Sequence, residues 1–331
     1  MDVPIAHAHA ERIGDDLLVT WRGGGPDVAV FVSDTPDDAG VDLREPDRPG
    51  RIVVRGVDPA IRPFVHLLAG DGPFVVVAER LIPLEGALNF RDVGGYRGAG
   101  GRQVRWGRVF RSDHLGDLTE ADELRLAQLG VQLVVDYRGP AEHEATPSRI
   151  VEGHAIVRHD RPISDGEEDG KSLWTRIMDG SLPAFGPDDL ARYYARTIAT
   201  SAPIFGEVLT MAANAEHHAM VFHCTAGKDR TGLTAALLLG ALGVDEGDIL
   251  DDYELSNRYR GGRRVEETRP MLAEQGIDIE QYLALFTAPR PALATALAEL
   301  RATHGSIEGY LREVAGVDPA VLDALRATML V

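Results

Sequence analysis

A cysteine and an arginine separated by five residues carry the clearest chemistry in this sequence of 331 residues. Cys224 and Arg230 lie in 219–244 (AMVFHCTAGKDRTGLTAALLLGALGV), which reads as a short apolar strand, a tight polar loop and a long apolar helix. Such a loop at a helix N-terminus points successive backbone N–H groups inward and adds the positive end of the helix dipole, so it can bind a phosphate. The same amides would stabilise a thiolate at Cys224, and the guanidinium of Arg230 can hold two phosphate oxygens. The pattern indicates a cysteine nucleophile directed at phosphorus.

Two other interpretations of this loop are weakened by the residues around it. A Walker A loop would place Ser or Thr after the Gly-Lys pair, where this chain has Asp229, and a glycine where it has Phe222. A buried structural cysteine would explain Cys224 alone. It would not explain the whole run HCTAGKDRTG (223–232), which supplies a histidine, a turn glycine and a helix-initiating Thr-Gly.

HCTAGKDRTG resembles the signature loop of the protein-tyrosine-phosphatase superfamily. Its Lys-Asp-Arg variant is similar to that of an atypical bacterial and fungal group, which acts on phosphotyrosine and, in some members, on phosphoserine/threonine and phosphoinositides. Further matches are NFRDVGGY (89–96), RSD (111–113) and DYR (136–138), so the resemblance covers roughly Leu84 to the C-terminus. It implies that substrate phosphate is bound by Thr225, Ala226, Gly227, Lys228, Thr231, Gly232 and Arg138. It also implies that the loop is supported by His223, Arg91, Asp92, Arg111 and Asp113.

The general acid that protonates the leaving oxygen has two candidates. Well-known tyrosine phosphatases take this acid from a Trp-Pro-Asp loop, a tripeptide that this chain lacks. Asp229 lies inside the loop, where the atypical relatives are thought to carry the acid, and Asp136 ends a predicted strand on the opposite wall. Either carboxylate could instead serve in an ion pair, Asp136 with Arg138 and Asp229 with its own neighbour Arg230. We favour Asp229, because a carboxylate in the loop is within direct reach of the leaving oxygen.

Three other loop side chains admit two roles each. Lys228 could be a second cation for a highly charged substrate such as a phosphoinositide, or a solvated lysine. The hydroxyl of Thr231 could hydrogen-bond the sulfur and help it leave, or bond backbone at the helix start. His223 is expected to orient the loop rather than to titrate.

Two domains are expected from the length and the pattern of the chain. Residues 1–82 contain short alternating apolar runs separated by turn residues, which predict a small β-sandwich of the fibronectin-III or immunoglobulin type. Residues 83–331 are expected to form an α/β catalytic domain with a central, mostly parallel sheet flanked by helices and the cysteine loop between a strand and a helix. A helical lid or insert is expected around 255–300.

Several segments of the second domain carry more detailed expectations. The β-branched run 131–137 predicts a buried parallel strand whose carboxyl end delivers Asp136 near the cysteine loop. A further strand is predicted over 150–158. The polar, acidic segment 159–187 is long enough to be a wall of the site or a solvated insertion. The basic run RGGRR (260–264) predicts a flexible turn or a rim that attracts phosphorylated substrates.

Composition limits the partners. A formal net charge of −18 argues against nucleic acid or anionic membrane as a bulk partner, and no apolar run is long enough to cross a membrane. The N-terminal sequence has neither a basic region nor an apolar core, so a cytoplasmic location is expected, with unconventional export left open. The single cysteine rules out an intramolecular disulfide, and no spacing supports a metal site or a cofactor. The expected partner is a phosphorylated protein or a phosphoinositide, the rival class is a phospho-binding pseudophosphatase, and the sequence does not give the oligomeric state.

Overall fold

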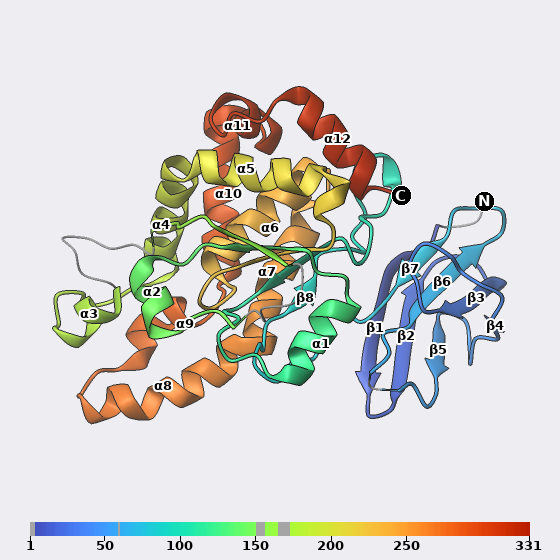
Figure 1. The fold of residues 1–331 in the computed structure, drawn as a ribbon, viewed down its shortest axis with the longest axis horizontal. Helices are drawn as coiled ribbons and strands as arrows, with labels where there is room; N and C mark the ends of the chain where they lie inside the picture. Colours follow the sequence, from blue (N-terminus) through green and yellow to red (C-terminus); the bar gives the residue numbers. More distant parts are fainter. Residues whose placement is uncertain (1–3, 59, 150–155, 165–172) are drawn as a thin grey trace.

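The computed structural model describes residues 4–58, 60–149, 156–164 and 173–331. The chain forms a β-rich N-terminal part and a larger part in which helices surround a sheet, and the two lie side by side (Figure 1).

The N-terminal part consists of two antiparallel sheets whose apolar side chains share one core. One sheet has the order β1 (Ala6–Ile13), β2 (Asp16–Arg22), β5 (Arg51–Val54), and the other β4 (Leu43–Arg44), β3 (Val28–Ser33), β6 (Phe64–Ala69), β7 (Val75–Val77). Alternate residues of β2 (Leu17, Val19 and Trp21) point inward, as expected for a half-buried strand. The alternating apolar runs predicted in 1–82 are observed as the strands β2, β3, β5, β6 and β7. His7 and His9, near the N-terminus, belong to β1, which pairs along β2.

The larger part is built on a five-stranded sheet. Its order is β11 (Val157–Asp160), β10 (Leu133–Asp136), β12 (Met220–His223), β9 (Val109–Ser112), β8 (Arg91–Asp92). The first four strands are parallel and β8 is antiparallel to β9, so the mostly parallel sheet is confirmed. The register pairs Asp136 with His223 and His223 with Ser112, which brings the carboxyl ends of three strands to one edge.

Helices cover both faces of this sheet (Figure 1). Val109, Val135 and Phe222 point into the large helical core, whereas their neighbours along the strands point into a smaller core that includes Leu126 of α1. The helices are α1 (Glu120–Gln128), α2 (Pro140–Ala145), α3 (Leu173–Met178), α4 (Pro187–Thr200), α5 (Ala202–Ala213), α6 (Asp229–Ala241), α7 (Glu246–Ser256), α8 (Gly262–Glu274), α9 (Leu283–Phe286), α10 (Arg290–His304), α11 (Ile307–Glu313) and α12 (Pro319–Met329).

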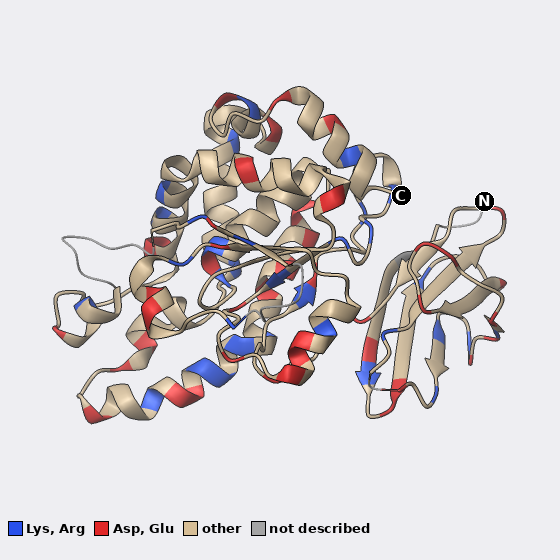
Figure 2. Ribbon diagram, viewed as in Figure 1, with Lys and Arg blue, Asp and Glu red and all other residues tan. Residues whose placement is uncertain are grey.

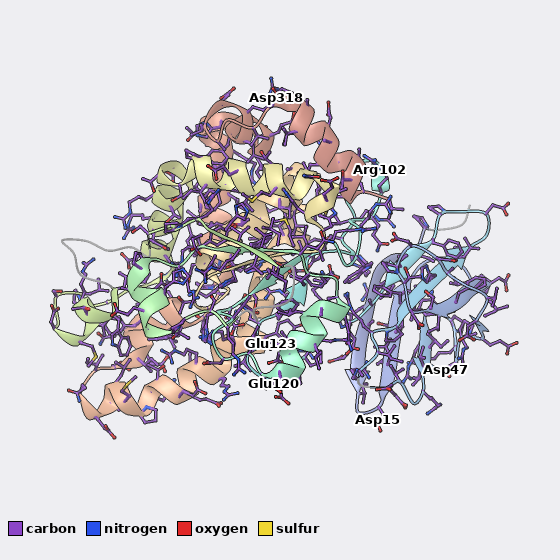
Figure 3. The ribbon with its side chains drawn as sticks, viewed as in Figure 1. Asp15, Asp47, Arg102, Glu120, Glu123 and Asp318 are labelled. Atoms are coloured by element: carbon purple, nitrogen blue, oxygen red, sulfur yellow. The ribbon has the colours of Figure 1, made fainter. Side chains whose placement is uncertain are left out.

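Two helices begin at side chains that cap them. Thr119 and Asp122 form a capping box at α1. The side chain of Asp318, at the start of α12 (Figure 3), accepts a hydrogen bond from the backbone N–H of Ala320 at 2.8 Å.

Two predictions for the helical part need correction. Of the strand predicted over 150–158, residues 150–155 lie outside the described part of the chain, and the observed strand is β11. The flexible turn predicted at 260–264 is wrong, because a π-helical turn (Asn257–Gly261) joins α7 directly to α8, which carries basic and acidic side chains along its length (Figure 2). Gly261 is buried there, and a Cβ would lie 3.2 Å from the carbonyl oxygen of Phe286, so this glycine permits close packing rather than flexibility.

The two parts of the chain meet around Trp106. Its ring packs with Phe64 and Val76 of the N-terminal sheets, and its Nε1 donates a hydrogen bond to the carbonyl oxygen of Val76 at 2.8 Å. Next to it, Nη1 of Arg62 donates to Oδ2 of Asp92 at 2.8 Å. The contact therefore includes a buried ion pair that ends in the NFRDVGGY segment.

Candidate active site

The loop between β12 and α6 holds Cys224 at the amino end of a buried helix. Cys224 is a free, buried cysteine directly after β12, and α6 begins at Asp229. Gly227 has a positive φ of 64°, and a Cβ there would lie 2.5 Å from backbone atoms of Ser112 and Asp113. Only glycine fits this turn, which curls the backbone of 224–228 over the start of the helix.

Below the loop, three polar side chains form a buried group. Nε and Nη2 of Arg138 donate to the carboxylate of Asp136, and Nε2 of His223 lies 3.2 Å from Oδ2 of the same carboxylate. Nδ1 of His223 lies 3.3 Å from the carbonyl oxygen of Cys224. Burial acts to raise the pKa of Asp136, but hydrogen bonds and charge from His223 and Arg138 outweigh it and hold this pKa well below its usual range. Asp136 is therefore an ionised support beneath the loop.

Two side chains from earlier in the chain, Asn89 and Arg111 of β9, hold the outer face of the loop. Nδ2 of Asn89 donates to the carbonyl oxygens of Ala226 and Gly227 at 3.2 and 3.1 Å, and Nη2 of Arg111 donates to the same oxygen of Gly227 at 2.8 Å. Because these donors bind carbonyl oxygens from outside, the loop amides remain directed toward its centre. Asn89 is the first residue of the NFRDVGGY segment, but the sequence alone assigned it no role.

Asp252 of α7 anchors these supports. Its Oδ2 accepts from Nη1 of Arg111 at 2.5 Å, and its Oδ1 accepts from Nε of Arg91 at 3.3 Å. Burial acts to raise the pKa of Asp252, but the two guanidinium groups hold it below its usual range. Burial together with the charge of Arg111 lowers the pKa of Arg91 to about 10. Arg91 and Arg111 thus share one buried carboxylate, and Arg111 is the one of the two that contacts the loop.

The other two predicted supports bind backbone. Asp92 accepts from the amides of Gly94 and Gly107, in addition to Arg62. Asp113 accepts from the amides of Leu88 and Asn89 and lies 3.6 Å from Nη1 of Arg260.

Arg230 faces a carboxylate that the sequence did not reveal. Nη1 and Nη2 of Arg230 donate to Oε2 and Oε1 of Glu142 at 2.7 and 2.6 Å, and the hydroxyl of Thr225 donates to Oε1 as well. Burial acts to raise the pKa of Glu142, but its hydrogen bonds to Arg230 and Thr225 lower it to about 2. Glu142 lies in the first turn of α2, four residues after Arg138, so an acidic helix start at the carboxyl edge of the sheet was the available signal.

Asp229 and Lys228 point to different surroundings. Oδ1 of Asp229 accepts from the hydroxyl of Tyr194 at 2.6 Å, and the side chain is 24% exposed. Nζ of Lys228 donates to the carbonyl oxygens of Ala284, Leu285 and Thr287 at 2.8 to 3.0 Å and lies 3.3 Å from Oδ1 of Asp229. Lys228 therefore ties the loop to the segment around α9.

The remaining loop residues form its rim and its inner wall. The carbonyl oxygen of Thr225 accepts from the amide of His114 at 3.3 Å, and Ala226 is half-buried. Among the described residues, the buried hydroxyl of Thr231 has no hydrogen-bond partner. A Cβ at Gly232 would lie 3.1 Å from the ring of Tyr253.

The beginning of the long acidic segment lies against Arg230. The carbonyl oxygen of Ile163 lies 3.3 Å from Nη1 of Arg230, and that of Ser164 accepts from the hydroxyl of Tyr193 at 3.2 Å. Residues 165–172 lie outside the described part of the chain. The described start of this segment therefore lies beside Arg230.

One group of side chains has the composition of a cation site. Asp136, His143 and Asp160 each place a possible ligand atom within 4.8 Å of the others. The carboxylate of Asp136 is already neutralised by Arg138, whose guanidinium would repel a metal ion. These residues therefore suit a metal poorly, and the absence of a metal remains a prediction.

A parallel sheet with a Cys-x5-Arg loop at its carboxyl edge defines the class of cysteine-dependent phosphatases. In agreement, the model of a family described as the tyrosine phosphatase family matches residues 82–331. The chain is 34% identical over 234 residues to a predicted tyrosine-protein phosphatase of Cupriavidus necator, which covers 71% of this chain and 84% of that relative. It is 29% identical over 279 residues to the triple specificity protein phosphatase PtpB of Mycobacterium tuberculosis, over 75% of this chain and 98% of the relative.

A solved structure, P. aeruginosa TpbA, aligns with 16% identity and a TM-score of 0.25 over 67% of this chain and 86% of that chain. The family model alone spans more than half of this sequence. The chain belongs to the tyrosine phosphatase family.

Proposed function

We propose that this protein hydrolyses phosphotyrosine through a cysteinyl-phosphate intermediate, with phosphoserine and phosphothreonine as further substrates. The observation that carries the proposal is the position of Cys224 and Arg230 at the two ends of a loop whose carbonyls are held outward by Asn89 and Arg111. This arrangement leaves the thiol, the loop amides and a guanidinium around one phosphate-sized centre.

In the first step the thiolate of Cys224 attacks phosphorus, an S–P bond forms and the P–O bond to the phenol breaks. Asp229 gives its proton to the departing oxygen. In the second step Asp229 takes a proton from water, whose oxygen attacks phosphorus, and the S–P bond breaks to release phosphate and the thiolate. The unpartnered hydroxyl of Thr231 supports its proposed role as a donor to the departing sulfur.

Two geometric facts favour Asp229 over Asp136 as the acid. Asp229 is partly exposed in the loop, whereas Asp136 is fully buried and shared by Arg138 and His223. A carboxylate whose pKa is held far below neutrality is a poor proton donor. We expect Asp229→Asn to abolish the descending, high-pH limb of the pH–rate profile, and Asp136→Asn to lower activity without moving that limb.

Arg230 is proposed to bind substrate through the edge that Glu142 leaves free. Its two terminal nitrogens each give one proton to Glu142, and within the described chain its Nε has no hydrogen-bond partner. Nε and the second proton of Nη2 can therefore hold two phosphate oxygens. The same proposal gives Thr225, Ala226, Gly227 and Gly232 the role of backbone amide donors and leaves Arg138 as a support.

The decisive test is phosphate release from a phosphotyrosine peptide by the wild type and by Cys224→Ser. We expect the variant to lose at least about a thousandfold in kcat/KM, because the nucleophile is removed. An unchanged rate would favour the phospho-binding alternative instead. Activity that survives a chelator would support the prediction that no metal takes part.

A phosphoinositide substrate is the second candidate within the same class. The relative named for triple specificity favours a broad range of substrates. Against a dedicated lipid site, the amine of Lys228 is occupied by three carbonyl oxygens. A comparison of kcat/KM for a phosphotyrosine peptide and a short-chain phosphoinositide decides between the two.

The division of the chain into two domains and the helical lid are also part of the proposal. The two antiparallel sheets with one shared core support a fibronectin-III or immunoglobulin-type domain over 1–82, followed by a catalytic domain over 83–331. The contact of Lys228 with 284–287 supports a helical lid within 255–300.

In the part of the chain that the structure describes, no helix has the length and apolar character to cross a membrane. The cytoplasmic location remains a prediction that cell fractionation would test.

A further inference from the structure

Two buried tyrosines form a chain of hydroxyl groups that ends on Asp229. Oη of Tyr194 in α4 donates to Oδ1 of Asp229 at 2.6 Å and lies 2.7 Å from Oη of Tyr253 in α7. A phenol has one proton, and that of Tyr194 is given to Asp229, so Tyr253 is the donor to Tyr194. Both side chains are buried within the helical core.

The two phenols are protonated at neutral pH. Burial, reinforced by the charge of Asp229, raises the pKa of Tyr194 and that of Tyr253 well above the ordinary value. The titratable and charged groups that face Asp229 are Lys228, Tyr193, Tyr194 and Tyr253.

These contacts divide the two oxygens of Asp229. Oδ1 is held by Tyr194 at 2.6 Å and lies 3.3 Å from Nζ of Lys228. Within the described residues, Oδ2 has no hydrogen bond, and about a quarter of the side chain is exposed. The carboxylate is therefore fixed in one orientation with a single oxygen available for proton transfer.

We propose that Tyr194, backed by Tyr253, is a positioning residue that orients Asp229 for proton transfer and stabilises the carboxylate left after the proton departs. The inference rests on the proposed function, because it assumes that Asp229 is the general acid. In the first step the proton leaves Oδ2 for the phenol oxygen as the P–O bond breaks, and the new negative charge is shared with Oδ1, where Tyr194 donates.

Helix α7 links this acid to the phosphate-binding loop. Tyr253 supports Tyr194, while its neighbour Asp252 holds Arg111, which in turn donates to the carbonyl oxygen of Gly227. One turn of one helix thus sets the position of both the acid and the loop amides.

The test compares Tyr194→Phe and Tyr253→Phe with Tyr310→Phe. Tyr310 is a matched control, because its buried hydroxyl donates to the carbonyl oxygen of Ile198 and not toward Asp229. Each variant is assayed over pH with phosphotyrosine, whose phenol needs a proton to leave, and with p-nitrophenyl phosphate, whose phenol leaves as the anion.

Tyr194→Phe is expected to move the descending limb of kcat for phosphotyrosine to higher pH by roughly one unit, since the ionised carboxylate loses a charge-assisted hydrogen bond. It should lower kcat for phosphotyrosine about tenfold and for p-nitrophenyl phosphate less than about threefold. Tyr253→Phe should act in the same direction with a smaller size, and it carries the test if Tyr194→Phe does not fold. An unmoved limb, or an equal loss on both substrates like that of Tyr310→Phe, would overturn the inference.

Asp229→Asn and Cys224→Ser separate this inference from the proposed function. If Cys224→Ser keeps wild-type activity, the proposed function fails, and the inference with it. If Asp229→Asn keeps the descending limb, the acid assignment fails and takes the inference with it, while the cysteine mechanism stands. If Asp229→Asn removes the limb and Tyr194→Phe leaves it in place, only the inference fails.

Discussion

Arg230 and Glu142 are joined edge to edge, with Nη1–Oε2 and Nη2–Oε1 distances of 2.7 and 2.6 Å. The pair fixes the plane of the guanidinium beside the Cys224 loop. Burial acts to lower the pKa of Arg230, but the hydrogen bonds to Glu142 and the charges of Cys224 and Glu142 outweigh it and hold this pKa above its ordinary value. Thr225 joins the pair through its hydroxyl. A negative charge thus lies against the residue that is proposed to bind a negatively charged substrate.

Replacing Glu142 by Gln should therefore affect binding and turnover in opposite directions. Removal of the competing charge is expected to tighten the binding of inorganic phosphate, whereas looser alignment of Arg230 lowers kcat about tenfold. Inhibition by phosphate and steady-state kinetics measure the two effects. Glu144→Gln, on the exposed side of α2, is the control and should change neither. Weaker phosphate binding in Glu142→Gln would contradict this account.

The same pair should make stability depend on pH. Burial opposes ionisation of Glu142, but Arg230 and Thr225 lower its pKa from 4.5 to about 2. A lowered pKa in the folded state stabilises the protein above pH 4.5, and this stabilisation is lost as the pH falls toward 2. It amounts to at most about 3 kcal/mol, reduced by the partial exposure of the side chain. Urea unfolding of wild type and Glu142→Gln should show a difference in free energy that is full at pH 7 and narrows between pH 4.5 and 3. If the difference in free energy of unfolding stayed constant over this pH range, the ion pair of Glu142 with Arg230 would not be its source.

Gly227→Ala should disable the loop. A Cβ would lie 2.5 Å from backbone atoms of Ser112 and Asp113, which cannot move without distorting β9, and φ is +64°. We expect a loss of activity of at least about a hundredfold and a destabilisation of about 2–4 kcal/mol. Gly100→Ala is the matched control, because its φ is +68° but nothing lies within 4 Å of the new Cβ. Gly100→Ala therefore measures only the cost of placing alanine at a positive φ, about 1 kcal/mol, and should leave activity unchanged. Equal effects of the two changes would exclude the steric argument.

The sequence was most informative where chemistry and periodicity are local. The strand that ends at Phe222 and His223, the loop and the start of α6 follow from a β-branched and apolar run, a glycine and a helix-forming run in direct succession. The register that brings Asp136 beside His223 follows from parallel pairing, which the buried run 131–137 already indicated.

The missing parts of the site depend on pairing over long sequence separations. Glu142 is an ordinary acidic residue at a helix start, and only the fold places it 2.6 Å from Arg230. Tyr194 lies on the amphipathic helix α4, where the sequence pattern predicts only that a tyrosine packs in the core. Lys228 reads as a free cation, because the carbonyl oxygens that surround it come from 284–287, more than fifty residues later. Hydrogen bonds to backbone leave no signature in residue types.

Lys228→Met distinguishes a structural lysine from a substrate-binding one. The change removes three hydrogen bonds to Ala284, Leu285 and Thr287 and leaves their carbonyl oxygens without this partner. We expect kcat/KM to fall by a similar factor, about tenfold, for a phosphotyrosine peptide, p-nitrophenyl phosphate and a short-chain phosphoinositide, because the loop loses a support common to all. Arg263→Met, at an exposed position of α8, is the control. A loss confined to the phosphoinositide would restore Lys228 as a substrate cation.

The ion pair of Arg62 and Asp92 should make the N-terminal sheets necessary for the stability of the catalytic part. Arg62 is buried, its guanidinium lies 5.1 and 5.2 Å from the ring centroids of Phe64 and Trp106, and Nη1 donates to Asp92 at 2.8 Å. Arg62→Met would leave the fully buried carboxylate of Asp92 without its counter-charge, so the free energy of unfolding should fall by about 3 kcal/mol.

Arg108→Met removes an ion pair between the same two parts of the chain, but at their exposed edge, where Nη2 lies 3.0 Å from Asp37. Exposed pairs contribute less than about 1 kcal/mol, so this matched variant should be close to wild type. Urea unfolding of the intact chain measures both. Asp92 holds the turn at Gly94 and directly follows Arg91, and Arg91 shares the carboxylate of Asp252 with Arg111. The Arg62 variant should therefore also lose part of its activity, to the extent that the Cys224 loop is loosened. Equal stability of the two variants would mean that the contact between the N-terminal sheets and the NFRDVGGY segment is carried by Trp106 packing alone.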